Sequence, residues 1–145
     1  MSTINKPNKF LPTTKEEMKQ RGWDELDVVL ITGDAYIDSP FMGIAVVGRI
    51  LEDMGLRVGI IGQPDVNSDV DINRMGEPKL FWGVSGGSID SMVSNYTATK
   101  RYRSTDDYTP GGKNDKRPDR ATLVYTNLIR RYFKNTVPIV LGGIE

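Results

Sequence analysis

The chain alternates between short, continuous runs of apolar residues and longer segments in which apolar residues recur at helical spacing. The continuous runs are rich in β-branched and aliphatic residues, which is typical of strands that are buried on both faces of a sheet. We therefore predict strands at DVVLIT (27–32), LRVGIIG (56–62), PKLFWGVS (78–85) and VPIVLGG (137–143).

Helices are predicted between these strands. The segments with helical spacing or helix-start signals are PTTKEEMKQRGW (12–23), FMGIAVVGRILEDMG (41–55), NSDVDINRMG (67–76), SIDSMVSNY (88–96) and RATLVYTNLIRRYF (120–133). Thr13 or Thr14 can cap the first of them, and Asp119 opens the last. The pattern at 67–76 is the weakest and predicts only a short helix.

This alternation defines the fold class as α/β. Hydrophobic strands joined by helices form a parallel sheet that is covered on both faces. Right-handed crossovers make it an open, doubly wound, mainly parallel sheet of about four strands, which is a Rossmann-like arrangement. We assign residues 1–12 to a polar N-terminal arm and 13–145 to the domain. Because LGGIE opens a strand-to-helix turn and no helix follows, we expect the domain to be truncated.

Composition excludes several kinds of chemistry. The 145 residues include no cysteine and no histidine, so thiolate and imidazole metal ligands and the usual catalytic triads are excluded within the chain. The 19 basic and 19 acidic residues balance, so no net field attracts nucleic acid or an anionic membrane. No apolar stretch is long enough to cross a bilayer and no signal peptide is evident, which predicts a cytoplasmic protein.

Four segments should meet at one edge of the sheet, where doubly wound sheets bind ligands beyond the carboxyl ends of their strands. These segments are TGDAYIDSP, GQPDVN, SGGSID and GGIE. They supply the candidate cofactor-binding residues Asp34, Tyr36, Asp38, Ser85, Gly86, Gly87, Gly142 and Gly143. We identify no catalytic residue and no metal ligand in the chain.

The same segments also have structural interpretations. The amides of SGGSID can bind phosphate or carboxylate, but this sequence equally suits a tight turn before a helix that Ser88 caps. In GDAYIDSP, Asp38 or Ser39 can cap the next helix, while the other polar residues can orient a substrate. Asp65 suits a turn better than a ribose contact, because the glycine fingerprint of dinucleotide sites is missing.

The segment NYTATKRYRSTDDYTPGGKNDKRPDR (95–120) is unusually long for a loop within a compact domain, which marks it as functional. Its tyrosines lie among basic residues and can stack on RNA bases, although the same rings and arginines also suit a protein surface. We expect this segment to pack over the carboxyl edge of the sheet or against a neighbouring domain. We also expect it to be partly disordered when the domain is isolated.

Four stretches resemble the N-terminal region of the YgiQ-type family of uncharacterised radical-SAM proteins. They are FLPTTKEEMKQRGWDELDVVLITGDAYIDSPFMG, FWGVSGGSIDSMVSNYTATKRYRSTDDYTPGGK, RPDRATLVYTNLIR and IVLGGIE. The similarity covers nearly the whole chain, and YTPGG followed by RPDRA is its most specific part.

The resemblance implies a longer protein, in which an α/β region similar to the cobalamin-binding type of fold precedes a radical-SAM barrel. The barrel's C-x-x-x-C-x-x-C motif binds a [4Fe–4S] cluster and S-adenosylmethionine, and none of these cysteines lies in this chain. Many relatives have a histidine where this chain has Ser39. Without any histidine, an imidazole of this chain cannot hold cobalamin, and nothing in the sequence requires cobalamin to bind in another way.

The main hypothesis is therefore an accessory domain of a radical-SAM enzyme of unknown substrate, inactive by itself. Its partner is the radical-SAM domain of the same polypeptide, and the candidate residues line the cleft that faces that domain. One alternative is a module that binds a phosphate-bearing or nucleotide-like ligand through SGGS. The other is an RNA-binding domain that uses residues 95–120.

Overall fold

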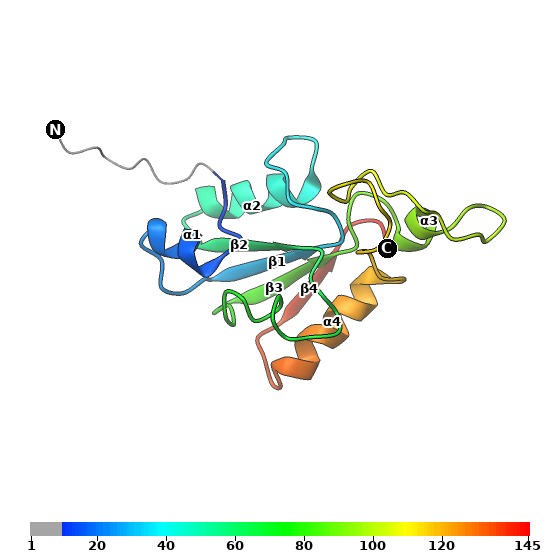
Figure 1. Ribbon diagram of the computed structural model, residues 1–145. Coiled ribbons are helices and arrows are strands. Elements are labelled where there is room, and N and C mark those ends of the chain that lie inside the picture. The colour runs from blue at the N-terminus through cyan, green and yellow to red at the C-terminus, as the bar shows by residue number, and fades with distance from the viewer. Residues whose placement is uncertain (1–9) are drawn as a thin grey trace.

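The computed structural model describes residues 10–145, which form one sheet flanked by helices (Figure 1). The elements are α1 (Lys15–Gln20), β1 (Val28–Thr32), α2 (Gly43–Asp53), β2 (Val58–Gly62), β3 (Phe81–Ser85), α3 (Ser91–Asn95), α4 (Ala121–Tyr132) and β4 (Ile139–Gly142). All four predicted strands are present. None of the helices within residues 10–145 combines the length and the apolar character that crossing a bilayer requires.

The four strands are parallel, and their order in the sheet is β2-β1-β3-β4. The order therefore changes direction between β1 and β3. Thr32 pairs with Gly62 on one side and with Ser85 on the other, and Ser85 pairs with Gly142. Because these residues end their strands at one level, the segments that follow them share one edge. The predicted α/β class with an open parallel sheet is confirmed.

The two faces of the sheet are covered by different helices, as Figure 1 shows. On one face α4 packs Tyr125 and Leu128 against a cluster that includes Trp82 of β3. On the other face α2 packs over a smaller cluster that contains Leu30 and Ile60 of β1 and β2. Leu11, which falls within the predicted polar arm, is buried in this second cluster, whereas residues 1–9 lie outside the described part.

Two of the predicted helices differ from the structure. Residues 67–76 form successive turns, because the Asp65 carboxylate accepts hydrogen bonds from the Asn67 amide and the Ser68 hydroxyl, both at 3.0 Å. Such side-chain acceptors compete with helical hydrogen bonding. The helix predicted at 88–96 is the single short α3, which Asp90 caps instead of Ser88.

The predicted caps of α2 and α4 were also wrong. Neither Asp38 nor Ser39 caps α2, which begins at Gly43 with no side-chain cap, because the Asp38 carboxylate is bound to the Arg49 guanidinium. Asp119 does not cap α4, because its carboxylate accepts hydrogen bonds from Asn95 and from the Tyr96 hydroxyl. In both cases the carboxylate binds a side chain that is distant in the sequence instead of the backbone amides at the start of the helix.

Residues 95–120 fold back over the carboxyl edge of the sheet. Two antiparallel bridges, Tyr96 with Tyr102 and Thr105 with Lys113, organise the segment. The Tyr108 carbonyl oxygen then accepts a hydrogen bond from the Ala35 amide just beyond β1, at 2.9 Å. The expected packing over the carboxyl edge is confirmed, while partial disorder in isolation stays a prediction.

An ion pair joins the starts of β1 and β2. The Asp27 carboxylate accepts hydrogen bonds from the backbone amide (2.8 Å), Nε (3.0 Å) and Nη2 (2.8 Å) of Arg57. The hydrogen bonds from the Arg57 guanidinium lower the pKa of Asp27 from 3.8 to about 2. Because the folded state favours the charged carboxylate, the pair stabilises the fold above the unfolded-state pKa.

This stabilisation should be lost as the pH falls from about 3.8 to about 2, the interval between the two pKa values. We expect the Asp27→Asn variant to be less stable than the wild type near neutral pH, by an amount that shrinks across that interval. Urea unfolding at a series of pH values measures the difference, with Asp107→Asn as the control because Asp107 is exposed. A difference that does not change with pH would contradict this assignment.

Candidate functional site

The carboxyl edge of the sheet brings together six of the eight candidate residues. Five of them, Asp34, Ser85, Gly87, Gly142 and Gly143, border a single cleft beside the sheet. Gly86 lies between Ser85 and Gly87 in the same turn. Of the four segments predicted to meet at one edge, those following β1, β3 and β4 border this cleft, whereas no residue of 63–67, after β2, borders it.

The remaining two candidates have structural partners away from the cleft. The Tyr36 hydroxyl accepts a hydrogen bond from the Leu11 amide at 3.3 Å, and burial raises the pKa of this phenol. The Asp38 carboxylate binds Arg49 of α2. Neither side chain borders the cleft.

Asp34 is the buried carboxylate at the centre of this edge, with 2% of its surface exposed. Its Oδ2 atom accepts hydrogen bonds from both the backbone amide and the hydroxyl of Ser88, each at 2.7 Å. Donors of the SGGSID turn, for which sequence analysis considered an anionic ligand or a tight turn before a helix, therefore bind a carboxylate of the chain itself.

Arg117 is the residue that sequence analysis missed. Its fully buried guanidinium enters from the segment 95–120 and donates to Asp34 Oδ1 at 2.7 Å and to the Gly86 carbonyl oxygen at 2.6 Å. Asp106 is also buried, and its carboxylate lies 3.4 Å from Arg117 Nη2, the atom that donates to Asp34. The segment 95–120 contains seven basic residues, and the sequence does not indicate which of them is buried. The motif RPDRA is the only signal in the sequence that singles out Arg117.

Two glycines make room for this guanidinium. A Cβ atom at Gly33 would overlap the Gly86 carbonyl oxygen, and one at Gly87 would overlap both Arg117 and Asp34. Gly87 also has a φ of +115°, a conformation that residues with side chains rarely adopt. Gly33 and Gly87 are thus required for the approach of the chain to Arg117, whether or not they also serve a ligand.

Arg117 fills the crevice between the ends of β1 and β3, which is the switch point where doubly wound sheets bind their ligands. A buried ion pair of this kind is held by its geometry, and removing one partner leaves an uncompensated charge. Asp34 is therefore committed to the fold as a hydrogen-bond acceptor. Because Arg117 occupies the crevice, the neighbouring cleft is the part of this edge that is open to a ligand.

Glu145 closes the other side of this edge. Its carboxylate accepts hydrogen bonds from the Ser91 hydroxyl and from the amide (3.2 Å) and hydroxyl (2.8 Å) of Thr122 at the start of α4, where the Ser91 hydroxyl oxygen also accepts from the Ala121 amide at 3.2 Å. Burial tends to raise the pKa of this carboxyl, but the hydrogen bonds from Ser91 and Thr122 outweigh burial and lower it. Glu145 thus supplies the cap that Asp119 was predicted to provide.

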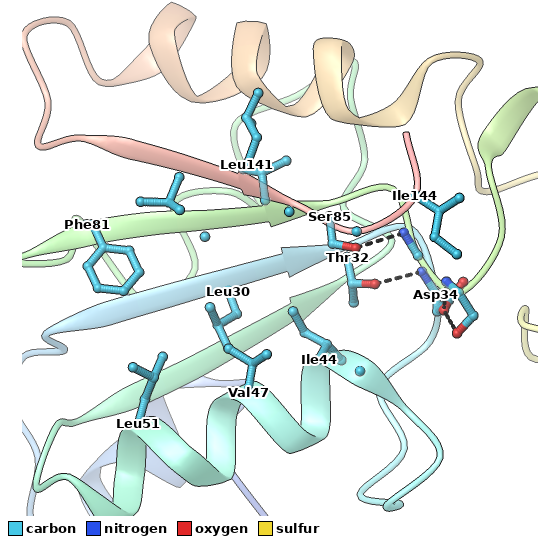
Figure 2. Close-up of a pocket in the computed structure, with 18 of the residues that line it drawn as sticks. Leu30, Thr32, Asp34, Ile44, Val47, Leu51, Phe81, Ser85, Leu141 and Ile144 are labelled. Carbon is cyan, nitrogen blue, oxygen red and sulfur yellow. Dashed lines mark hydrogen bonds between the residues drawn. The ribbon is translucent and has the colours of Figure 1, made fainter.

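The cleft has a volume of about 640 Å³ and lies between α2 and the adjoining face of β1, β3 and β4 (Figure 2). Its walls are mainly apolar and include Leu30, Ile44, Val47, Leu51, Phe81 and Val140. At the carboxyl end the hydroxyls of Thr32 and Ser85 accept hydrogen bonds from the amides of Asp34 (3.2 Å) and Gly87 (3.1 Å). Their own protons are then available to an acceptor in the cleft.

This arrangement is suited to binding a small molecule. An apolar cleft with a few polar groups at one end is the usual form of a small-molecule site. Among the described residues no group of three or more histidine, cysteine, aspartate or glutamate side chains could hold a metal ion. An iron–sulfur cluster does not fit this chain, because the whole sequence contains no thiolate to bind it.

The fold and its edge define a doubly wound α/β domain with a cleft at the carboxyl ends of its strands. Comparison with known families is more specific. Residues 10–145 match the family described as Radical SAM N-terminal, and the chain belongs to this family. The resemblance identified from the sequence is confirmed.

The relatives are much longer than this chain. A UPF0313 protein of Thermotoga petrophila is 62% identical over 136 residues, which make up 94% of this chain and 24% of that protein. A UPF0313 protein of Pseudomonas aeruginosa is 54% identical over 139 residues, or 96% of this chain and 18% of that protein. The chain thus spans a quarter or less of each of these relatives. No solved structure matches it significantly.

The buried ion pair predicts a large effect from one substitution. Replacing Arg117 by Met should reduce the free energy of unfolding by about 3–5 kcal/mol, because Asp34 and Asp106 then stay buried without their cation. Lys113→Met is the matched control in the same segment, and it should cost at most about 1 kcal/mol because its ion pair with Asp115 is exposed. Urea unfolding compares the two, and equal effects would contradict the central role of Arg117.

Proposed function

We propose that this chain is the accessory N-terminal domain of a longer radical-SAM enzyme. The observation that supports this proposal is family membership over residues 10–145, together with relatives of which this region forms only 24% or 18%. In this proposal another part of the polypeptide binds the [4Fe–4S] cluster and S-adenosylmethionine. The absence of cysteine from this chain is consistent with that division.

Within such an enzyme we assign to the cleft the binding of an apolar part of the substrate. The hydroxyls of Thr32 and Ser85 would donate hydrogen bonds to an acceptor on that molecule, beside the backbone of Gly142 and Gly143. The cluster and S-adenosylmethionine, when bound, supply the radical chemistry. The residues of this chain would bind and orient the substrate and keep water from it.

The two alternative functions have less support. A phosphate site at SGGS would need donors that Asp34 already occupies, and it would place an anion next to a buried carboxylate. RNA binding by stacking would need free rings, but Tyr96 and Tyr102 pack edge to face with centroids 5.6 Å apart. The Tyr102 hydroxyl also donates to the Asn114 carbonyl oxygen at 2.8 Å.

The longer polypeptide, purified anaerobically, should contain about four irons per chain and show a reduced-cluster spectrum that S-adenosylmethionine shifts. The 145-residue chain should contain no iron. S-adenosylmethionine should raise the Tm of the longer polypeptide and leave that of the short chain unchanged, because its site lies elsewhere.

Absence of iron from the longer polypeptide after anaerobic reconstitution would refute the proposal. An increase in the Tm of the short chain with AMP would instead favour the phosphate-binding alternative. Salt-dependent binding of single-stranded RNA would favour the third function.

A further inference from the structure

Helix α2 carries apolar residues on its outward side as well as on the side that faces the sheet. Its inward side buries Ala45 and Gly48 against the sheet. On its outward side Val46, Val47, Ile50 and Met54 are all exposed. A helix that covers one face of a domain normally carries polar residues on its outward side.

The exposed side of α2 continues into the cleft. Val47 borders the cleft, and Ile50 and Met54 follow it at the spacing of one helical stripe. Phe41, which is 92% exposed just before the helix, borders the same cleft. We call Phe41, Val46, Val47, Ile50 and Met54 the α2 surface. Together with the cleft it forms a contiguous apolar area, and such areas usually mark interaction sites.

The sheet shows the same lack of cover on this face. All-parallel sheets normally have helices over both faces. Here α2 packs on β1 and β2 and leaves the α2 side of β4 open, where Val140 is 52% exposed. On the opposite face α4 packs on β3, and residues 95–120 occupy the carboxyl edge. The edge strand β4 is itself little covered, since Leu141 beside Val140 is 58% exposed.

We propose that the polypeptide segment that follows Glu145 in the longer protein covers the α2 surface and the adjoining cleft. This inference rests on the proposed function only in that the chain is the N-terminal domain of a longer polypeptide. The matched region makes up 24% and 18% of the two UPF0313 relatives, so more than three-quarters of each lies outside it. Ile144, exposed and on the rim of the cleft, places the start of such a segment directly beside the surface it would cover.

Two other occupants fit less well. Anionic lipid is disfavoured because acidic Asp53 borders the surface, and the nearby cations Arg21 and Arg49 are already paired with Glu52 and Asp38. A second copy of this chain would have to compete for this surface with the rest of the longer polypeptide, which is tethered to the same domain. The segment 95–120 is not part of this surface, since its buried Arg117 and Asp106 serve the domain itself.

Methionine oxidation provides a direct test, because Met54 lies on the α2 surface and Met92 lies on α3 outside it. Met54 is 70% exposed and Met92 is 38% exposed, so Met54 should oxidise faster in the 145-residue chain. In the longer polypeptide the rate at Met54 should fall several-fold, while the rate at Met92 stays the same. Hydrogen peroxide treatment followed by peptide mass spectrometry measures both, with buried Met18 reporting that the fold is intact.

A matched pair of variants tests whether the α2 surface is the one that is covered. Ile50 on α2 and Leu123 on α4 are both 56% exposed, on helices that cover opposite faces of the sheet. In the longer polypeptide Ile50→Asp should return Met54 oxidation to the rate in the short chain, whereas Leu123→Asp should leave Met54 protected. Met18 should stay protected in both variants.

Equal oxidation of Met54 in the short and long chains would overturn the proposal, as would protection of Met92 in place of Met54. Protection of Met54 in the short chain that increases with protein concentration, together with self-association in sedimentation, would identify a second copy as the occupant and also overturn it. Iron measured on the same preparation separates this outcome from failure of the proposed function, because a protected Met54 without iron supports docking and refutes only the enzyme assignment.

Discussion

The buried ion pair between Arg117 and Asp34 is the interaction on which the arrangement of the carboxyl edge depends. One guanidinium joins the segment after β1, the Gly86 carbonyl oxygen after β3 and the buried Asp106 of the long segment 95–120. Because an uncompensated buried charge is far more costly than a lost surface contact, none of these three stretches can leave the others without a large penalty. The Arg117 side chain thereby holds the long segment 95–120 against the carboxyl edge of the sheet.

This ion pair also determines where a ligand could bind. In a doubly wound sheet the crevice at the change of strand order is the usual binding place, and Arg117 fills it here. The donors of the SGGSID turn face Asp34 for the same reason. What is left open is the neighbouring cleft, whose apolar walls come from α2 and the sheet and whose polar groups are confined to its carboxyl end. The structure thus brings most of the candidate residues to the edge predicted from the sequence, and the cleft lies to one side of the filled crevice.

The strands could be predicted because their signal is local. DVVLIT and LRVGIIG contain continuous apolar runs that only a doubly buried strand accommodates, and each lies within one residue or two of its predicted bounds. The helix caps could not be predicted in the same way, because a nearby acceptor such as Asp119 can be taken by a distant donor. Arg117 is the extreme case, since its partner Asp34 is 83 positions away in the sequence and nothing local distinguishes it from its basic neighbours. Local periodicity therefore predicted the framework, while pairings between distant residues required the structure.

The two open features of the domain are physically connected. The cleft is closed by the sheet on one side, by α2 on another and by the turns after β1 and β3 at its polar end, so its open side is the one that the α2 surface borders. A polypeptide segment covering that surface would turn a groove exposed to water into an enclosed cavity. Hydrogen bonds from Thr32 and Ser85 would then act in a region without competing water, where they discriminate more strongly between ligands. Docking and binding would in this way depend on each other, and a domain with neither cysteine nor histidine could still influence the chemistry of the polypeptide to which it belongs.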